Sequence, residues 1–110
     1  MSEAAVALQS DPRDTEYQVF DRVTKALSSS KDKALDDKDY LEAIDTNRRL
    51  WQALEVDVAS TENVLPDELK AKIVSLAIWV DKHSAKVTRG EAKVQPLITV
   101  NQAIMEGLAA

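Results

Sequence analysis

The stretch PDELKAKIVSLAIWV, residues 66–80, decides the fold of this chain. It opens with a proline and two acidic residues, which is typical of the first turn of an α-helix. Apolar residues then recur at steps of three and four, the helical period. Between Ile73 and Val80 only Ser75 is polar, so the helix is apolar nearly all round. Such a helix must be surrounded by others, and we expect residues 66–88 to form the central, most buried helix.

Three further helices are predicted along the chain. Asp11-Pro12 pairs an N-cap residue with a proline at the first helical position, and this pair predicts a helix over residues 12–28. Apolar residues spaced by four and three predict another over residues 37–59. A proline again opens the last helix, predicted over residues 96–108.

These helices predict the fold class. With two glycines and three prolines in 110 residues, the chain has little room for hairpins. Amphipathic helices with short connections indicate an all-α fold, a compact bundle of about four helices. We expect a single domain over residues 1–110, with residues 1–10 as a flexible N-terminus.

Two of the apolar seams contain an asparagine, Asn47 in the second helix and Asn101 in the last. Buried amides are costly unless they are hydrogen-bonded. We therefore expect both side chains to be hydrogen-bonded within the core. The alternative is that they lie at the wet edge of their seams.

The composition limits where the protein works. The chain has a formal net charge of −5 and no cysteine, which excludes disulfides and thiolate metal sites. No stretch approaches the roughly 18–20 uninterrupted apolar residues of a membrane span. Residues 1–10 lack the positive region of a secretory signal. We expect a cytoplasmic protein that does not interact with membranes.

Residues suited to catalysis are sparse. The lone His83 lies in an apolar seam, where a core or boundary histidine is a simpler interpretation than a catalyst. The serines lack the glycine context of a nucleophile elbow, and two glycines cannot build a phosphate-binding loop. The acidic pair Asp36-Asp37 is typical of a helix start, and no Glu-x-x-His pattern supports a metal site. We expect no enzymatic activity, no cofactor and no metal.

Binding of single-stranded nucleic acid needs basic residues among exposed aromatic rings. Trp51 and Trp79 both lie in core-like stripes, which favours burial of each ring. A modestly basic segment runs from Lys70 to Lys93, but a solvated helix face explains it more simply. We do not expect nucleic acid to be the partner.

Several short strings follow one another in a recognisable order. Residues 47–51 read Asn-Arg-Arg-Leu-Trp, and residues 63–66 read Asn-Val-Leu-Pro. A helix ending in Trp79-Val80 comes next, and Asp-Pro-Arg stands near the N-terminus. Over about residues 11–108, this order and spacing resemble the flagellar biosynthesis regulator FlaF family.

The resemblance implies a non-enzymatic cytoplasmic protein needed for flagellin production. The family is linked to flagellin synthesis and export, alongside the partner regulator FlbT, which acts on flagellin mRNA. Flagellin's terminal segments are apolar helices that must not assemble before export. A groove between bundle helices could cover such a segment. The resemblance therefore implies a flagellin-binding chaperone that regulates secretion during bacterial flagellum biogenesis.

Two other functions stay open. A regulator that contacts flagellin mRNA directly would need a basic stripe along the third helix. That stripe would consist of Lys70, Lys72, Lys82, Lys86, Arg89 and Lys93. A helical adaptor of the flagellar secretion system would differ from the chaperone only in its partner.

Candidate contact residues follow from the helix period. Arg49 points about half a turn away from the seam of its own helix, so core packing does not explain it. One interpretation is a surface ion pair with Asp45. The other is that Arg49 borders the partner groove with Gln52 and Val56, and that its planar fork binds a carboxylate or a helix C-terminus on flagellin. Trp51 and Trp79 are the remaining candidates for partner binding.

Overall fold

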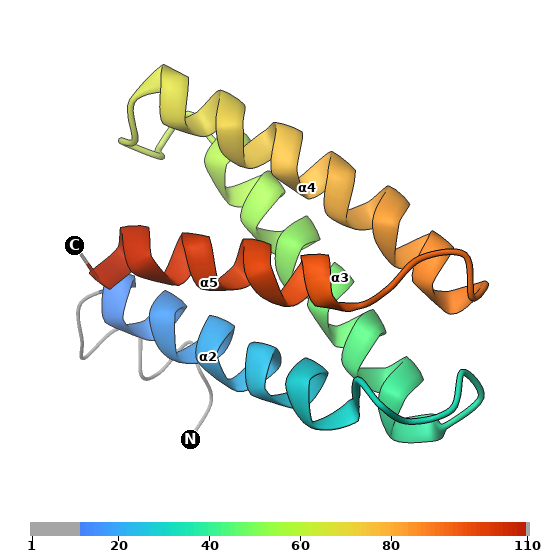
Figure 1. Cartoon of the computed structure of the whole chain (residues 1–110). Helices are drawn as coiled ribbons and strands as arrows, with labels where there is room; N and C mark the ends of the chain where they lie inside the picture. Colours follow the sequence, from blue (N-terminus) through green and yellow to red (C-terminus); the bar gives the residue numbers. More distant parts are fainter. Residues whose placement is uncertain (1–11, 110) are drawn as a thin grey trace.

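The structure, a computed structural model, describes residues 12–109 of the chain, with the side chains of residues 17–107. Within this range it contains four helices and no strand (Figure 1). The helices are α2 (Pro12–Ser30), α3 (Lys38–Ala59), α4 (Asp67–Thr88) and α5 (Gln95–Ala109). The all-α prediction is confirmed, and each helix begins and ends within two residues of its predicted bounds. The predicted N-cap Asp11 and the flexible segment over residues 1–10 lie outside the described residues.

Local capping explains where α3 begins. The side chain of Asp37 accepts hydrogen bonds from the backbone N–H groups of Asp39 and Tyr40, at 2.9 and 3.1 Å. These two N–H groups belong to the first turn of the helix and have no partner within it. An acidic N-cap also complements the positive end of the helix dipole.

A glycine ends α4. Gly90 has a φ of 75°, and its N–H donates to the carbonyl of Val87 at 3.0 Å. The N–H of Glu91 reaches back to the carbonyl of Lys86 at 2.9 Å. This pair of bonds is the Schellman arrangement, which needs a left-handed residue just beyond the helix. Leu35 lies so near that a Cβ on Gly90 would stand 2.8 Å from its Cδ1.

The position of α4 contradicts the sequence prediction. α3 packs against both α2 and α4, and α5 packs mainly along α2. α4 contacts α3 along its length and meets α5 only to a small extent, at the end where a short connection joins them (Figure 1). The expectation that residues 66–88 form the central helix is therefore wrong. α2 and α3 each pack against two other helices, whereas α4 is covered mainly on the side that faces α3.

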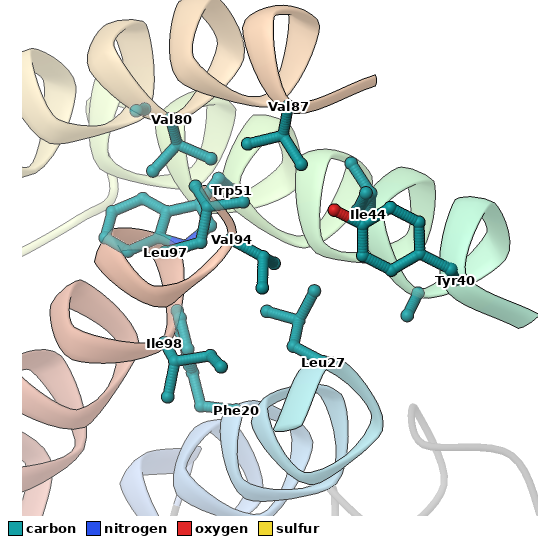
Figure 2. Packing of buried hydrophobic residues seen from close by; sticks show 12 residues of the cluster. Phe20, Leu27, Tyr40, Ile44, Trp51, Val80, Val87, Val94, Leu97 and Ile98 are labelled. Carbon is teal, nitrogen blue, oxygen red and sulfur yellow. The ribbon is translucent and has the colours of Figure 1, made fainter. Parts of the chain in front are cut away.

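The core is built from all four helices (Figure 2). Trp51 of α3 is its largest fully buried side chain, and it meets Phe20 of α2 edge to face, with ring centroids 5.6 Å apart. Such edge-to-face contacts suit the charge distribution of aromatic rings. Aliphatic side chains from the four helices fill the space around the two rings. They include Leu27, Ile44, Val80, Val87, Leu97 and Ile98.

A chain of hydrogen bonds crosses this apolar core. The indole N–H of Trp51 donates to Oδ1 of Asn101 at 2.9 Å. The amide nitrogen of Asn101 donates to Oδ1 of Asn47 at 2.8 Å and to Oγ1 of Thr24 at 3.1 Å. The prediction that the seam asparagines are hydrogen-bonded in the core is confirmed for Asn101. It is confirmed only in part for Asn47, whose Nδ2 has no hydrogen-bond partner among the described residues.

Candidate partner-binding surface

The side of α4 that no other helix covers carries both apolar and charged side chains. Ile78 is 47% exposed, and Leu76 and Trp79 are partly buried at the border of the core. The helical period places Ile78 and Trp79 away from the buried stripe of Ile73 and Val80, and Leu76 beside that stripe. We call this arc the α4 outer face. Its members are Glu68, Ala71, Lys72, Ser75, Leu76, Ile78, Trp79, Lys82 and Lys86.

The α4 outer face contains a shallow hollow of about 510 Å³. Ala71 and Ser75, two small residues one turn apart, leave space between longer side chains. The wall residues are Glu68, Lys72 and Leu76, and nearly all of the exposed lining is apolar. A hollow of this kind can receive one large apolar side chain of a partner.

Trp79 lies one turn beyond the hollow. Its ring stacks on the imidazole of His83, with centroids 4.7 Å apart and the planes inclined by 19°. Nε2 of His83 lies 2.7 Å from the carbonyl oxygen of Lys93, in the connection that leads to α5. His83 is thus held at the border of the core, as predicted, and it supports one face of Trp79.

Basic side chains surround the apolar part of this face. Lys72, Lys82 and Lys86 have no side-chain hydrogen bond or ion pair with any described residue. Two other members of the predicted basic stripe are engaged locally. Lys70 donates to the carbonyl of Asn63 at 2.7 Å, and Arg89 pairs with Glu91 at 2.9 Å.

The predicted contact residues do not form one surface. Trp51 is only 1% exposed, so burial removes it from any docking surface. Arg49 and Val56 lie on the outer side of α3, where their exposed fractions are 77% for the Arg49 side chain and 73% for Val56. Gln52 is exposed there too, whereas Trp79 belongs to α4.

The surroundings of Arg49 support the first of its two interpretations. Its Nε lies 3.0 Å from Oδ2 of Asp45, one turn earlier on α3. Both side chains are largely exposed, so solvent screens the attraction. The neighbouring Arg48 differs, because it reaches across to Asp81 of α4 at 2.7 Å and joins the two helices.

A second, more polar hollow of about 440 Å³ lies between α2 and α3. Ala26 and Ala43 line its base, and Lys33 and Asp39 at its border are paired with each other at 3.2 Å. Its charged groups are therefore partly satisfied within the chain. This hollow makes a weaker candidate for a docking surface than the α4 outer face.

The residues that the structure describes were compared with the requirements of a metal site and of a membrane-spanning helix. No group of three or more His, Cys, Asp or Glu side chains there could hold a metal ion. None of its helices is both long and apolar enough to cross a membrane. Hydrogen bonding to Asp21 raises the pKa of Lys25, and hydrogen bonding to Arg89 lowers the pKa of Glu91. Burial raises the pKa of Tyr40.

Besides the helical period, the sequence contains a signal for the α4 outer face. A helix that is apolar nearly all round predicts either burial of the whole helix or an exposed apolar surface suited to binding a partner. The small residues Ala71 and Ser75, spaced by four, marked where that surface is hollow. Burial was the expectation, and the tertiary structure buries Ile73, Ala77 and Val80 but leaves Ile78 47% exposed.

Comparison with known proteins gives one match. Neither a curated protein nor a solved structure is significantly similar to the chain. The profile of the family described as flagellar protein FlaF matches residues 3–108, which is nearly the whole chain. The match confirms the resemblance drawn from the ordered strings, and it indicates a role in flagellum biogenesis. This chain belongs to the FlaF family of flagellar proteins.

Proposed function

We propose that this protein is a non-catalytic chaperone that binds flagellin and supports its synthesis and export. The observation that carries the proposal is the α4 outer face, an apolar helix surface left uncovered by the rest of the bundle. Exposed apolar surface of this kind is typical of sites where another protein docks. Membership of the FlaF family supports flagellin as the partner.

The physical logic is that of a helix laid on a helical surface. Terminal segments of flagellin that are apolar helices need a cover until they reach the growing filament. Leu76, Ile78 and Trp79 offer apolar area within about one turn of α4. A helix of the partner packed there would bury its own stripe at the same time. We place this encounter in the cytoplasm, where flagellin is made.

The proposal can be tested with purified flagellin monomer. We expect a defined complex in size-exclusion chromatography with light scattering, and slower polymerisation of flagellin when the complex forms. Ile78→Asp should weaken the complex, because it replaces an exposed apolar side chain of the α4 outer face with a charge. Its side chain is 47% exposed, so the fold should not depend on it.

Two control variants probe the other candidate surface. Val56→Asp and Arg49→Ala alter the outer side of α3, and both side chains are largely exposed. We expect both variants to bind flagellin like the wild type. Loss of binding in these two, with Ile78→Asp unaffected, would move the contact to α3. A wild-type chain that forms no complex with flagellin would refute the proposed function.

A further inference from the structure

We infer that the α4 outer face recognises an acidic amphipathic helix, with Lys72, Lys82 and Lys86 binding carboxylates while the hollow receives an apolar side chain. The inference rests on the proposed function, since the helix is taken to be a segment of flagellin. It goes further by assigning the docking surface and the chemistry of the segment that fits it.

The first argument is local charge. The chain as a whole has a formal net charge of −5, yet the α4 outer face has three lysines and one acid, Glu68. Lys72 and Lys82 have no side-chain hydrogen bond or ion pair to any described residue, and Lys86 has only a longer-range attraction to Glu91. A positive patch on an otherwise acidic protein favours a negatively charged partner and disfavours others.

The second argument is spacing. Along α4, at 1.5 Å per residue, Lys72 and Lys86 are about 21 Å apart and Lys82 and Lys86 about 6 Å. A helix packed nearly antiparallel on α4 would match these lysines with two acidic residues one turn apart and a third about ten residues further on. A large apolar side chain within one turn of that third acidic residue would lie over the hollow at Ala71 and Ser75.

The third argument concerns the kind of macromolecule. Nucleic acid would also satisfy the lysines, but the hollow beside them is lined almost wholly by apolar area. Bases of a single strand stack on successive exposed rings. The α4 outer face has one ring, Trp79, and His83 already covers one side of it. A protein helix uses both features, the apolar hollow and the charges.

The experiment measures the affinity for purified flagellin by calorimetry in four variants with single substitutions. Lys72→Glu and Lys86→Glu reverse charges on the α4 outer face, and Ala71→Leu fills the hollow. Lys31→Glu makes the same charge change in the exposed connection after α2, and is the matched control. We expect a loss of about tenfold or more for the first three and none for Lys31→Glu, with the lysine contribution shrinking as salt is raised.

A spectroscopic readout locates the contact directly. Acrylamide quenches exposed indoles, so in the free protein it should act on Trp79 and not on Trp51, which is 1% exposed. Docking of flagellin on α4 should protect Trp79 from quenching. Circular dichroism of each variant should match that of the wild type, because all four substitutions are at exposed positions.

The outcomes separate this inference from the proposed function. If the wild type does not bind flagellin, the proposed function fails and the inference fails with it. If the wild type binds and the α4 variants bind equally well, or Lys31→Glu loses as much, the docking surface is elsewhere while the function stands. Two results would overturn the inference in favour of another occupant. One is binding of a flagellin mRNA transcript that the lysine variants abolish. The other is formation of an oligomer by this chain when no flagellin is present.

Discussion

Asn101 of α5 donates an amide hydrogen to Oδ1 of Asn47 of α3 at 2.8 Å, between two side chains that are both fully buried. The indole N–H of Trp51 can only donate, so it fixes which end of the Asn101 amide faces it. That orientation in turn points the Asn101 nitrogen at Asn47 and Thr24. A polar chain therefore sets how α5 lies against α2 and α3.

Removing Asn101 should cost more stability than removing Asn47. Asn101→Leu leaves the indole N–H of Trp51 and Oδ1 of Asn47 buried without partners, and each such group costs about 1–3 kcal/mol. Asn47→Leu removes a nitrogen that has no partner anyway, and Asn101 keeps Thr24. Urea unfolding of the two variants measures the difference. Equal midpoints would show that the hydrogen bonds of Asn101 stabilise the fold no more than those lost with Asn47.

The two tryptophans should differ in their effect on stability, although their positions in the helical pattern look alike. Trp51→Ala empties a fully buried site and should lower the unfolding free energy by about 3–5 kcal/mol. Trp79→Ala removes a half-buried ring and should cost about 1–2 kcal/mol. Thermal melts followed by circular dichroism compare them. A Trp79 variant as unstable as the Trp51 variant would place Trp79 in the core and weaken the case for the α4 outer face.

The two glycines predict opposite responses to the same substitution. Gly90→Ala should destabilise by about 1–2 kcal/mol, because a Cβ disfavours the left-handed conformation at φ 75° and would press on Leu35. Gly107→Ala lies in α5 with no atom within 4 Å of the new Cβ, and should stabilise by up to about 1 kcal/mol. Denaturant midpoints of the two variants measure the expected loss of stability for Gly90→Ala and the expected gain for Gly107→Ala. Adding Leu35→Ala to Gly90→Ala separates the two causes, because only the steric part should be relieved.

Tyr40 predicts how stability changes at alkaline pH. Burial raises the pKa of its phenol above the ordinary value of 10.0, because the charged form is poorly solvated in the core. The folded state then holds its proton more tightly than the unfolded state. The resulting stabilisation is fully present below pH 10 and is lost as the pH rises through the folded pKa. Unfolding midpoints from about pH 8 to about pH 11 should fall less steeply for Tyr40→Phe than for the wild type. If the unfolding midpoints of the two proteins fall equally steeply with pH, the raised pKa of Tyr40 does not contribute to stability.

Much of the fold could be predicted from local chemistry. Asp37, Pro66 and Gly90 each act within a few residues, through a cap, a preset φ and a left-handed turn, so the helix ends were readable from the sequence. The burial of Asn101 and Trp51 could be predicted as well, since the three–four period places both on the apolar stripe of their helices. The candidate partner-binding surface was harder to predict from the sequence. The residues predicted around Arg49 lie on α3, apart from the α4 outer face.

The sequence alone determined the number, type and limits of the helices, because helical hydrogen bonds and caps form between near neighbours in the chain. It did not determine which helix is central. Each helix has an apolar stripe, and the period of a stripe does not say which other stripe it meets. The tertiary structure decided that α5 packs along α2 and leaves α4 uncovered on one side. For that reason the apolar run from Ile73 to Val80 supplies both a core face, through Val80, and an exposed face, through Ile78.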